Sequence, residues 1–132
     1  MAKLLLVAQG ARLRGWAAEA LEDYLRRMPR GYALEHAARA PRGARLVALD
    51  ERGRELTTRQ LAAQLGRWAG ERAPTAFVVG GPDGLDAQTK ADAALLLRLS
   101  AFTLPHALAQ LVLVEQLYRA ACLLTGHPYH RE

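Results

Sequence analysis

Four short runs of consecutive apolar residues restrict the fold of this chain more than any other feature of its sequence. They cover residues 4–8, 46–49, 77–79 and 95–99, the last of them interrupted by Arg98. A strand with one solvated face alternates apolar and polar residues, whereas a strand that is apolar throughout is buried on both faces. Strands of the second kind occur mainly in parallel sheets covered by helices. The runs therefore predict a buried parallel sheet.

Amphipathic segments separate these runs. Apolar residues three or four positions apart from Trp16 to Met28 predict one helix, and Thr57 with Gln60 has the spacing of a capping box that opens another. The other predicted elements are a weak strand at 32–36, a short helix at 88–93, and a helix with Pro105 in its first turn that runs to about 124. This alternation predicts an α/β fold with an open, mostly parallel sheet in one domain, residues 1–132.

Composition narrows the class of protein further. The hydrophobic fraction of 51% excludes a disordered chain, and the formal charge of +5 fits a polyanionic partner such as nucleic acid without requiring one. With Cys122 as the single cysteine, no intrachain disulfide can form. The apolar start at 1–7 is too short for a signal peptide or a membrane span, so we expect a cytoplasmic protein with no membrane partner.

Ligands of open parallel sheets bind beyond the carboxyl ends of the strands, which here means the loops after Leu49, Val79 and Leu99. The segment 80–84, GGPDG, matches neither G-x-G-x-x-G nor a P-loop, and taken alone it is as well explained by a plain turn. The segment 100–105 carries few charges and offers backbone amides and carbonyls to a flat ring, or simply connects a strand to a helix.

The helix at 106–124 is apolar around nearly its whole circumference, which requires burial on more than one side. In a domain this small, we expect its outer face to pack against a second copy in a symmetric dimer, with an internal position as the alternative. Glu115 and Arg119 are four residues apart and can pair along the helix, or Arg119 can reach a phosphate or a carboxylate.

The C-terminal segment 126–132 concentrates two histidines, a tyrosine and an arginine in seven residues. These side chains suit stacking on a base, contact with phosphate, and proton transfer near neutral pH. A metal site is a weaker interpretation, because the histidines lack further ligands with zinc-site spacing, so we expect no metal. A surface tail without a role is the remaining alternative.

Four motifs in order resemble a known family. They are VVGGPDG at 78–84, LSAFTLPH at 99–106, EQLYRA at 115–120 and HPYHRE at 127–132. Together they resemble the SPOUT-class methyltransferases that act on N3 of a pseudouridine in bacterial large-subunit (23S) rRNA. The segments YLRR at 24–27 and Leu49-Asp50 agree with this family as well, so that the resemblance covers nearly the whole chain.

The resemblance implies a C-terminal trefoil knot, an obligate homodimer, S-adenosyl-L-methionine as the cofactor, and 23S rRNA on the assembled ribosome as the partner. Carried over by position, the cofactor-binding residues are Leu49, Gly80, Gly81, Ser100, Ala101, Phe102, Thr103, Leu104 and Pro105. The residues carried over to the RNA-facing, catalytic side are Arg119, Tyr129, His130 and Arg131, with His106 as a further candidate.

Within this family we expect His130 or Arg131 to stabilise the deprotonated base, Tyr129 to stack or hydrogen-bond, and Arg119 to hold a phosphate or the cofactor end. We expect the tail to complete the site of the other subunit. Two alternatives stay open: a related SPOUT enzyme that acts on tRNA or a different uridine, and a non-catalytic ribosome-binding protein with the same fold.

The chain departs from the family pattern in one place. Family members usually carry a helix between the second and third strands, whereas the link at 40–45 is too short to hold one. A parallel crossover normally needs a dozen or more residues. Either the second strand is shortened and the link runs extended, or this edge of the sheet is rearranged. The cofactor loops lie elsewhere, so we expect the change to affect substrate docking or stability there.

Overall fold

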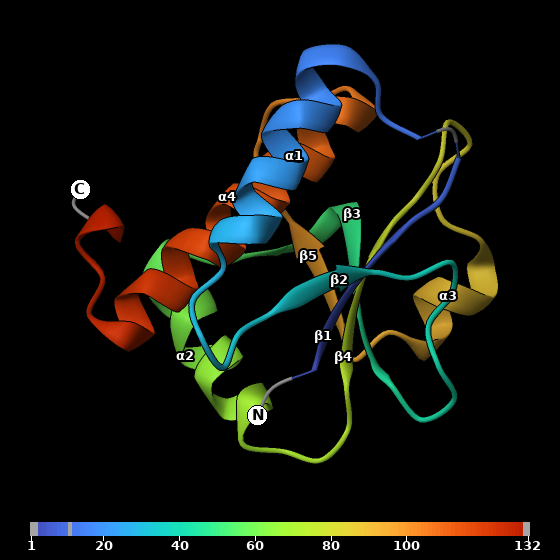
Figure 1. The fold of residues 1–132 in the computed structure, drawn as a ribbon. Helices are drawn as coiled ribbons and strands as arrows, with labels where there is room; N and C mark the ends of the chain where they lie inside the picture. Colours follow the sequence, from blue (N-terminus) through green and yellow to red (C-terminus); the bar gives the residue numbers. More distant parts are fainter. Residues whose placement is uncertain (1–2, 11, 131–132) are drawn as a thin grey trace.

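The computed structural model describes residues 3–10 and 12–130, and it has one sheet with helices on its flanks (Figure 1). The strands are β1 (Leu4–Ala8), β2 (Leu34–His36), β3 (Arg45–Glu55), β4 (Thr75–Val79) and β5 (Leu95–Arg98). The helices are α1 (Gly15–Arg27), α2 (Thr58–Ala69), α3 (Ala87–Asp92) and α4 (His106–Thr125), followed by a 3-10 turn, η1 (Pro128–His130).

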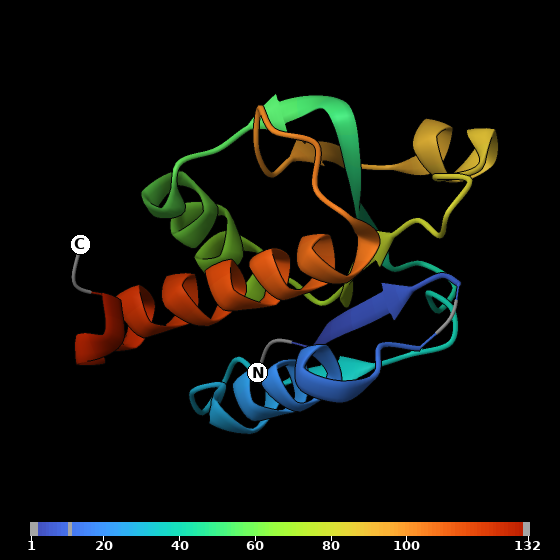
Figure 2. The same cartoon turned by 90° about the horizontal axis from the view of Figure 1, so that it is seen from above.

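The sheet has the order β2-β1-β4-β3-β5, and every neighbouring pair is parallel. Helices α1, α2 and α4 cover one face, with α4 between the other two, and α3 lies toward the other face (Figures 1 and 2). Strand residues alternate between two buried clusters, because Leu4 and Leu6 pack under the helices while Leu5 and Val7 face the other side. Burial on both faces confirms the predicted parallel α/β sheet.

Strand β3 differs from the prediction. Sequence patterning ends it at Asp50, but it continues to Glu55. Leu97 of β5 pairs first with Leu49 and then with Arg54, so the residues between form a bulge. The second half of the strand is largely exposed and polar, and for that reason apolar patterning misses it.

Gly53 makes this second pairing possible, because a Cβ at that position would lie 2.6 Å from the backbone carbonyl of Leu96. We therefore expect Gly53→Ala to push β3 away from β5 and to lower the free energy of unfolding by about 1–3 kcal/mol. Denaturant unfolding measures this. Gly70→Ala is the control, because its new Cβ meets only Arg67 at an ordinary 3.6 Å. Equal stability of the two variants would contradict the close approach.

The structure distinguishes between the two alternatives for the short link between β2 and β3. Residues 37–44 run from one edge of the sheet past β1 and β4 to β3, without a helix. Ala37, Ala40 and Ala44 pack against the cluster of Leu5 and its neighbours on the second face. The second strand is only three residues long, so the structure agrees with a shortened strand and an extended link.

Helix α4 is the longest described element; it begins at His106, where the predicted range of 106–124 begins, and ends one residue later than predicted. Pro105 is its N-cap residue rather than part of its first turn, and its carbonyl accepts from the amide of Ala109 at 2.8 Å. Gly126 ends the helix in the left-handed conformation, with φ of 77°. By length and composition alone the helix could cross a membrane, but half of that window is buried against the rest of the fold.

Candidate functional site

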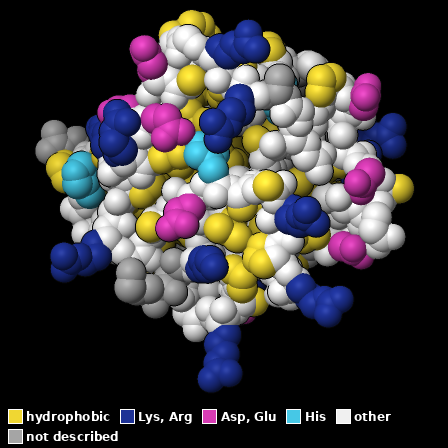
Figure 3. Space-filling view, turned by 45° about the vertical axis from the view of Figure 1, so that its right-hand side comes forward, with side chains coloured by type: hydrophobic (Ala, Val, Ile, Leu, Met, Phe, Trp, Pro, Cys, Tyr) yellow, Lys and Arg dark blue, Asp and Glu magenta, His cyan; other side chains and the backbone are white. Residues whose placement is uncertain are grey.

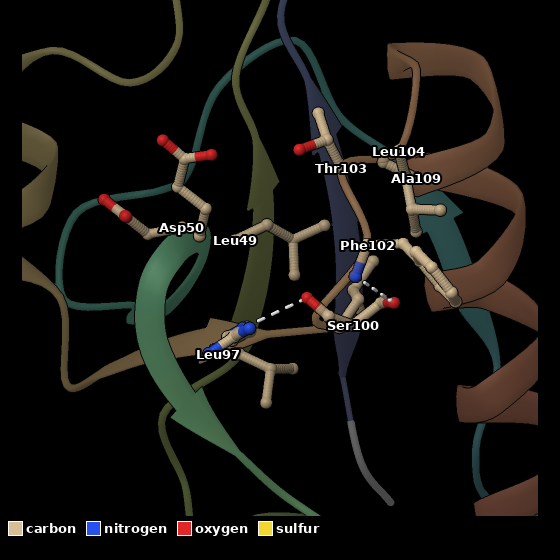
Figure 4. Close-up of a pocket in the computed structure, with 11 residues that line it drawn as sticks. Leu49, Asp50, Leu97, Ser100, Phe102, Thr103, Leu104 and Ala109 are labelled. Carbon is tan, nitrogen blue, oxygen red and sulfur yellow. Dashed lines mark hydrogen bonds between the residues drawn. The ribbon is translucent and has the colours of Figure 1, made fainter.

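A pocket lies beside the bulge of β3 and beyond the carboxyl end of β5, after the apolar runs where the sequence places a ligand (Figure 4). Its volume is about 150 Å³. The lining residues come from β3, β5, the loop that follows β5 and the first turn of α4. They are Leu49, Asp50, Glu51, Leu97, Arg98, Leu99, Ser100, Phe102, Thr103, Leu104 and Ala109. A second hollow of about 280 Å³ shares the loop residues and adds Arg52 and Ala101.

The loop after β5 is held by contacts to its first residues. Arg98 Nε donates to the carbonyl of Ser100 at 3.0 Å and also lies 3.3 Å from Oε1 of Glu55 on β3. The Ser100 hydroxyl accepts from the amide of Phe102 at 2.9 Å (Figure 4). These bonds shape residues 100–102 into a tight curve, with the Phe102 side chain 84% exposed.

Two carboxylates stand at the β3 side of the pocket, because Asp50 and Glu51 both line it. The carboxylate of Asp50 is only 8% exposed and lies 3.5 Å from Lys90 Nζ, while its Oδ1 accepts from the amide of Arg52 at 2.8 Å. Leucine side chains and Ala109 form the apolar part of the pocket lining. The pocket thus combines an apolar wall with two carboxylates, of which Asp50 is paired with Lys90, and with the guanidinium of Arg98.

Gly80 and Gly81 of the GGPDG segment do not line this pocket. A Cβ on Gly80 would lie 2.7 Å from the backbone carbon of Gly84, and Gly81 pairs with Gly84 across the turn. Gly81 also approaches Gly10 of the β1–α1 loop. In this structure both glycines therefore serve a tight turn, and Pro105 also lies outside the pocket lining.

The tail folds back onto α4 and α1. The Tyr129 hydroxyl donates to Oε2 of Glu115 at 2.9 Å and lies 3.2 Å from the hydroxyl of Tyr24. Arg119 donates twice to the same carboxylate oxygen, at 2.7 and 3.1 Å, and its guanidinium lies 5.0 Å from the Tyr129 ring centroid. The predicted pairing of Glu115 with Arg119 is confirmed. Of the two groups that the sequence allows Arg119 to reach, a phosphate or a carboxylate, the structure shows a carboxylate.

The other predicted residues at this end are only partly described. His130 belongs to η1, but the structure does not describe its side chain, and Arg131 lies outside the described residues. His106 lies at the opposite end of α4, where its Nε2 is 2.9 Å from Nε2 of Gln110. In the described part of the chain no group of three or more His, Cys, Asp or Glu side chains is placed to hold a metal ion.

Within one protomer the pocket and the tail are separate. Ala109 lines the pocket, whereas Glu115, which binds Tyr129, lies six residues further along α4, a rise of about 9 Å. Tyr129 packs on the α1 side of the helix, through Tyr24 and Tyr118. None of the tail residues that the structure describes lines the pocket.

Burial and hydrogen bonding raise the pKa of the Tyr129 phenol, through loss of hydration first and then through the bonds to Tyr24 and Glu115. The phenol is therefore protonated at neutral pH and acts as a donor. A tyrosine whose folded-state pKa is raised adds stability that is complete below its unfolded value near 10 and is lost as pH rises through the raised value.

We accordingly expect the free energy of unfolding to fall more steeply above pH 10 in the unaltered protein than in Tyr129→Phe. Denaturant unfolding at pH 8, 10 and 11 provides the comparison. Tyr32→Phe is the control, because it removes a tyrosine that has no part in the Tyr129 contacts. Parallel pH profiles for the unaltered protein and Tyr129→Phe would show that the phenol is not held in the protonated form.

Comparisons with known proteins agree with this architecture. A family model described as "Predicted SPOUT methyltransferase" matches residues 32–130. The chain belongs to the SPOUT methyltransferase family. A solved structure, titled as a probable methylase family protein from Haemophilus influenzae Rd KW20, superposes with a TM-score of 0.56 at 12% identity, covering 98% of this chain and 69% of that one. At that identity the likeness concerns the fold alone. Membership of the SPOUT family implies the knotted C-terminal part.

Full-length relatives are more similar. Proteins named "Ribosomal RNA large subunit methyltransferase H" from Polynucleobacter asymbioticus and Bordetella avium are 44% and 47% identical to this SPOUT chain. Each comparison covers 98% of the chain and 99% of the relative. They run over 146 and 154 positions, more than the 132 residues of this chain, so the relatives contain stretches that it lacks.

Proposed function

We propose that the chain transfers a methyl group from S-adenosylmethionine to N3 of a pseudouridine in 23S rRNA. The observation that carries this proposal is the full-length similarity to relatives named as large-subunit rRNA methyltransferases. The pocket at the carboxyl edge of β3 and β5 supports it, because five of the nine residues carried over as cofactor-binding line it: Leu49, Ser100, Phe102, Thr103 and Leu104.

The residues of the pocket fit such a cofactor. Leu49, Leu97 and Ala109 offer an apolar wall to a flat adenine ring, and the backbone of the loop at 99–104 offers polar groups to its edge. The carboxylates of Asp50 and Glu51 suit the positively charged part of the molecule. When bound, S-adenosylmethionine supplies an electrophilic methyl group on a sulfonium ion.

The residues of the protein must prepare the methyl acceptor for the reaction. N3 of pseudouridine is an imide nitrogen and is a poor nucleophile while it carries its proton. We assign the stabilisation of the deprotonated base to His130 or Arg131, which are groups of the tail that can carry a positive charge. Tyr129 acts as a hydrogen-bond donor or stacking partner, because its raised pKa prevents it from acting as a base.

We further propose a homodimer in which the tail of one protomer completes the pocket of the other. The separation of Tyr129 from the pocket within one protomer supports this arrangement. Two large apolar side chains, Trp16 of α1 and Leu108 of α4, remain 66% and 39% exposed, and a second copy would cover them. Arg119, bound to Glu115, holds the tail in place, and we assign to its part-exposed side chain a phosphate of the RNA as well. Action on ribosomes places the protein in the cytoplasm.

The test combines cofactor binding, methyl transfer to RNA and the mass of the protein in solution. Isothermal titration with S-adenosylmethionine should show one site per chain, and transfer of tritiated methyl should label large-subunit rRNA but not tRNA. Sedimentation equilibrium should give twice the mass of the chain. Absence of cofactor binding would favour the ribosome-binding protein without activity, and label in tRNA would favour the related SPOUT enzyme. A monomer with full activity would contradict the shared site.

A further inference from the structure

A second cavity opens beyond the carboxyl ends of β1 and β2, on the same edge of the sheet as the pocket but on the other side of β4. It consists of two adjoining hollows of about 350 and 310 Å³. We call it the β1–β2 cavity and define it by Leu6, Arg12, Leu13, Leu21, His36 and Ala38. The proposed methyl-transfer site uses none of these residues.

The walls and the rim of this cavity differ in chemistry. Leu6, Leu13 and Leu21 make the interior apolar, and Gln110, only 2% exposed, closes its inner end. His36 lies at the side, where its Nε2 is 2.8 Å from a carboxylate oxygen of Glu22. A flat, apolar group with polar edges, such as a nucleobase, matches an apolar hollow with a few polar groups.

The rim carries charges of both signs. Arg12 lines both hollows, while Glu22, the partner of His36, lines the second of them. Arg14 and Arg39 lie close by in the chain, two residues after Arg12 and directly after Ala38. Across the described residues, no carboxylate lies within ion-pair distance of these three guanidinium groups, whereas Arg98 and Arg119 have carboxylate partners. Figure 3, which brings forward the right-hand side of Figure 1, shows Lys, Arg, Asp and Glu side chains spread around apolar patches. Arg12 is therefore the group of the rim that suits a phosphate.

The position of the cavity relates it to the pocket. Strand β1 is separated from β3 by β4 alone, so the nearest strands of the cavity and of the pocket are two strand spacings, about 10 Å, apart. That separation is within reach of a nucleotide close to the methylated base on the same RNA strand. The short link at 37–44 forms part of the cavity, because Ala37 and Ala38 line it. A longer link would place additional residues there.

We infer that the β1–β2 cavity binds a nucleotide of the rRNA that flanks the methylated base, with the base in the apolar hollow and its phosphate at Arg12. This inference rests on the proposed function, because it takes rRNA as the substrate. It requires no contact with S-adenosylmethionine, so cofactor binding and nucleotide binding can be tested separately.

The experiment measures methyl transfer to ribosomes that lack the modification, with two variants of the full chain. Arg12→Ala with His36→Ala removes the polar groups, and Ala38→Trp fills the hollow. We expect both to raise KM for ribosomes about tenfold while kcat and cofactor affinity stay within about twofold, and the arginine variant to reduce the salt dependence of binding by about one ion. Thermal unfolding verifies that each variant folds; if Ala38→Trp does not, the double variant decides alone.

The matched control is Arg72→Ala, which removes one positive charge at the amino-terminal end of the strands, in the loop before β4. Unchanged KM in both cavity variants would overturn the inference, and so would an equal rise in the control, since that would show a general charge effect. Sedimentation of the protein with ribosomes separates the two proposals. If the unaltered chain binds ribosomes without methylating them, the proposed function fails, and the variants' affinities still decide whether the cavity binds RNA.

Discussion

A chain that ends at Pro128 should bind S-adenosylmethionine normally and transfer almost no methyl group. The deletion removes Tyr129 with its bonds to Glu115 and Tyr24, and it removes His130 and Arg131, the groups proposed to stabilise the deprotonated base. Loss of a proton-handling group costs about 100- to 10,000-fold in rate. Single-turnover transfer to ribosomes measures the loss, and calorimetry measures the cofactor affinity.

Single substitutions refine that result. His130→Ala and Arg131→Ala should each reproduce most of the loss, whereas Glu132→Ala, the matched control at the last residue, should retain activity. Near-normal turnover in the truncated chain would show that the tail has no part in catalysis. Loss of cofactor binding together with activity would show that the tail holds the cofactor, contrary to the role proposed for it.

Ala109→Trp should abolish cofactor binding, and with it all transfer. Ala109 lines the pocket from the first turn of α4, and an indole ring there would occupy much of a volume of about 150 Å³. We expect the dissociation constant to rise at least about 100-fold, which corresponds to about 2.7 kcal/mol of lost binding free energy. Calorimetric titration gives this value. Ala87→Trp, which places the same ring on the exposed start of α3, should bind normally.

The two variants together test the shared site. In a mixture of Ala109→Trp with the truncated chain, half of the dimers pair one of each, and each such dimer has one intact pocket and one intact tail. If the tail acts in trans these meet in the same site, so the mixture should recover about a quarter of the unaltered activity. If the tail acts within its own protomer, the mixture should remain inactive.

The sequence predicts the sheet well because its central strands are apolar on both faces. Strand β1 lies at Leu4–Ala8, as its pattern indicates, and β4 contains the predicted run 77–79 but begins two residues earlier, at Thr75. The capping box at Thr57 and Gln60 opens α2 as expected. Patterning fails where pairing depends on something other than burial. The second half of β3 is polar, and only the lack of a side chain at Gly53 reveals how closely it approaches β5.

Only part of the candidate site can be predicted from the sequence, because the rest depends on contacts between distant parts of the chain. The rule that ligands bind at the carboxyl ends of strands finds Leu49 and the loop at 100–104 without any coordinates. It does not find the Arg98 contacts that shape this loop, because they depend on the pairing of β5 with the second half of β3. It does not find the Ala109 side chain either, because that depends on how α4 packs beside the loop. Nor does it find Tyr24, which is 105 residues away from Tyr129 in the chain and meets it only through α1 packing on α4.

The most direct test of the proposed function is mass spectrometry of nucleosides and fragments from 23S rRNA. The comparison is between the source strain, a strain without this gene, and that strain complemented with the intact chain or with Ala109→Trp. The account predicts that one methyl group on one pseudouridine disappears in the deletion and returns only with the intact chain. An unchanged methylation pattern in the deletion strain, or restoration by Ala109→Trp, would contradict it.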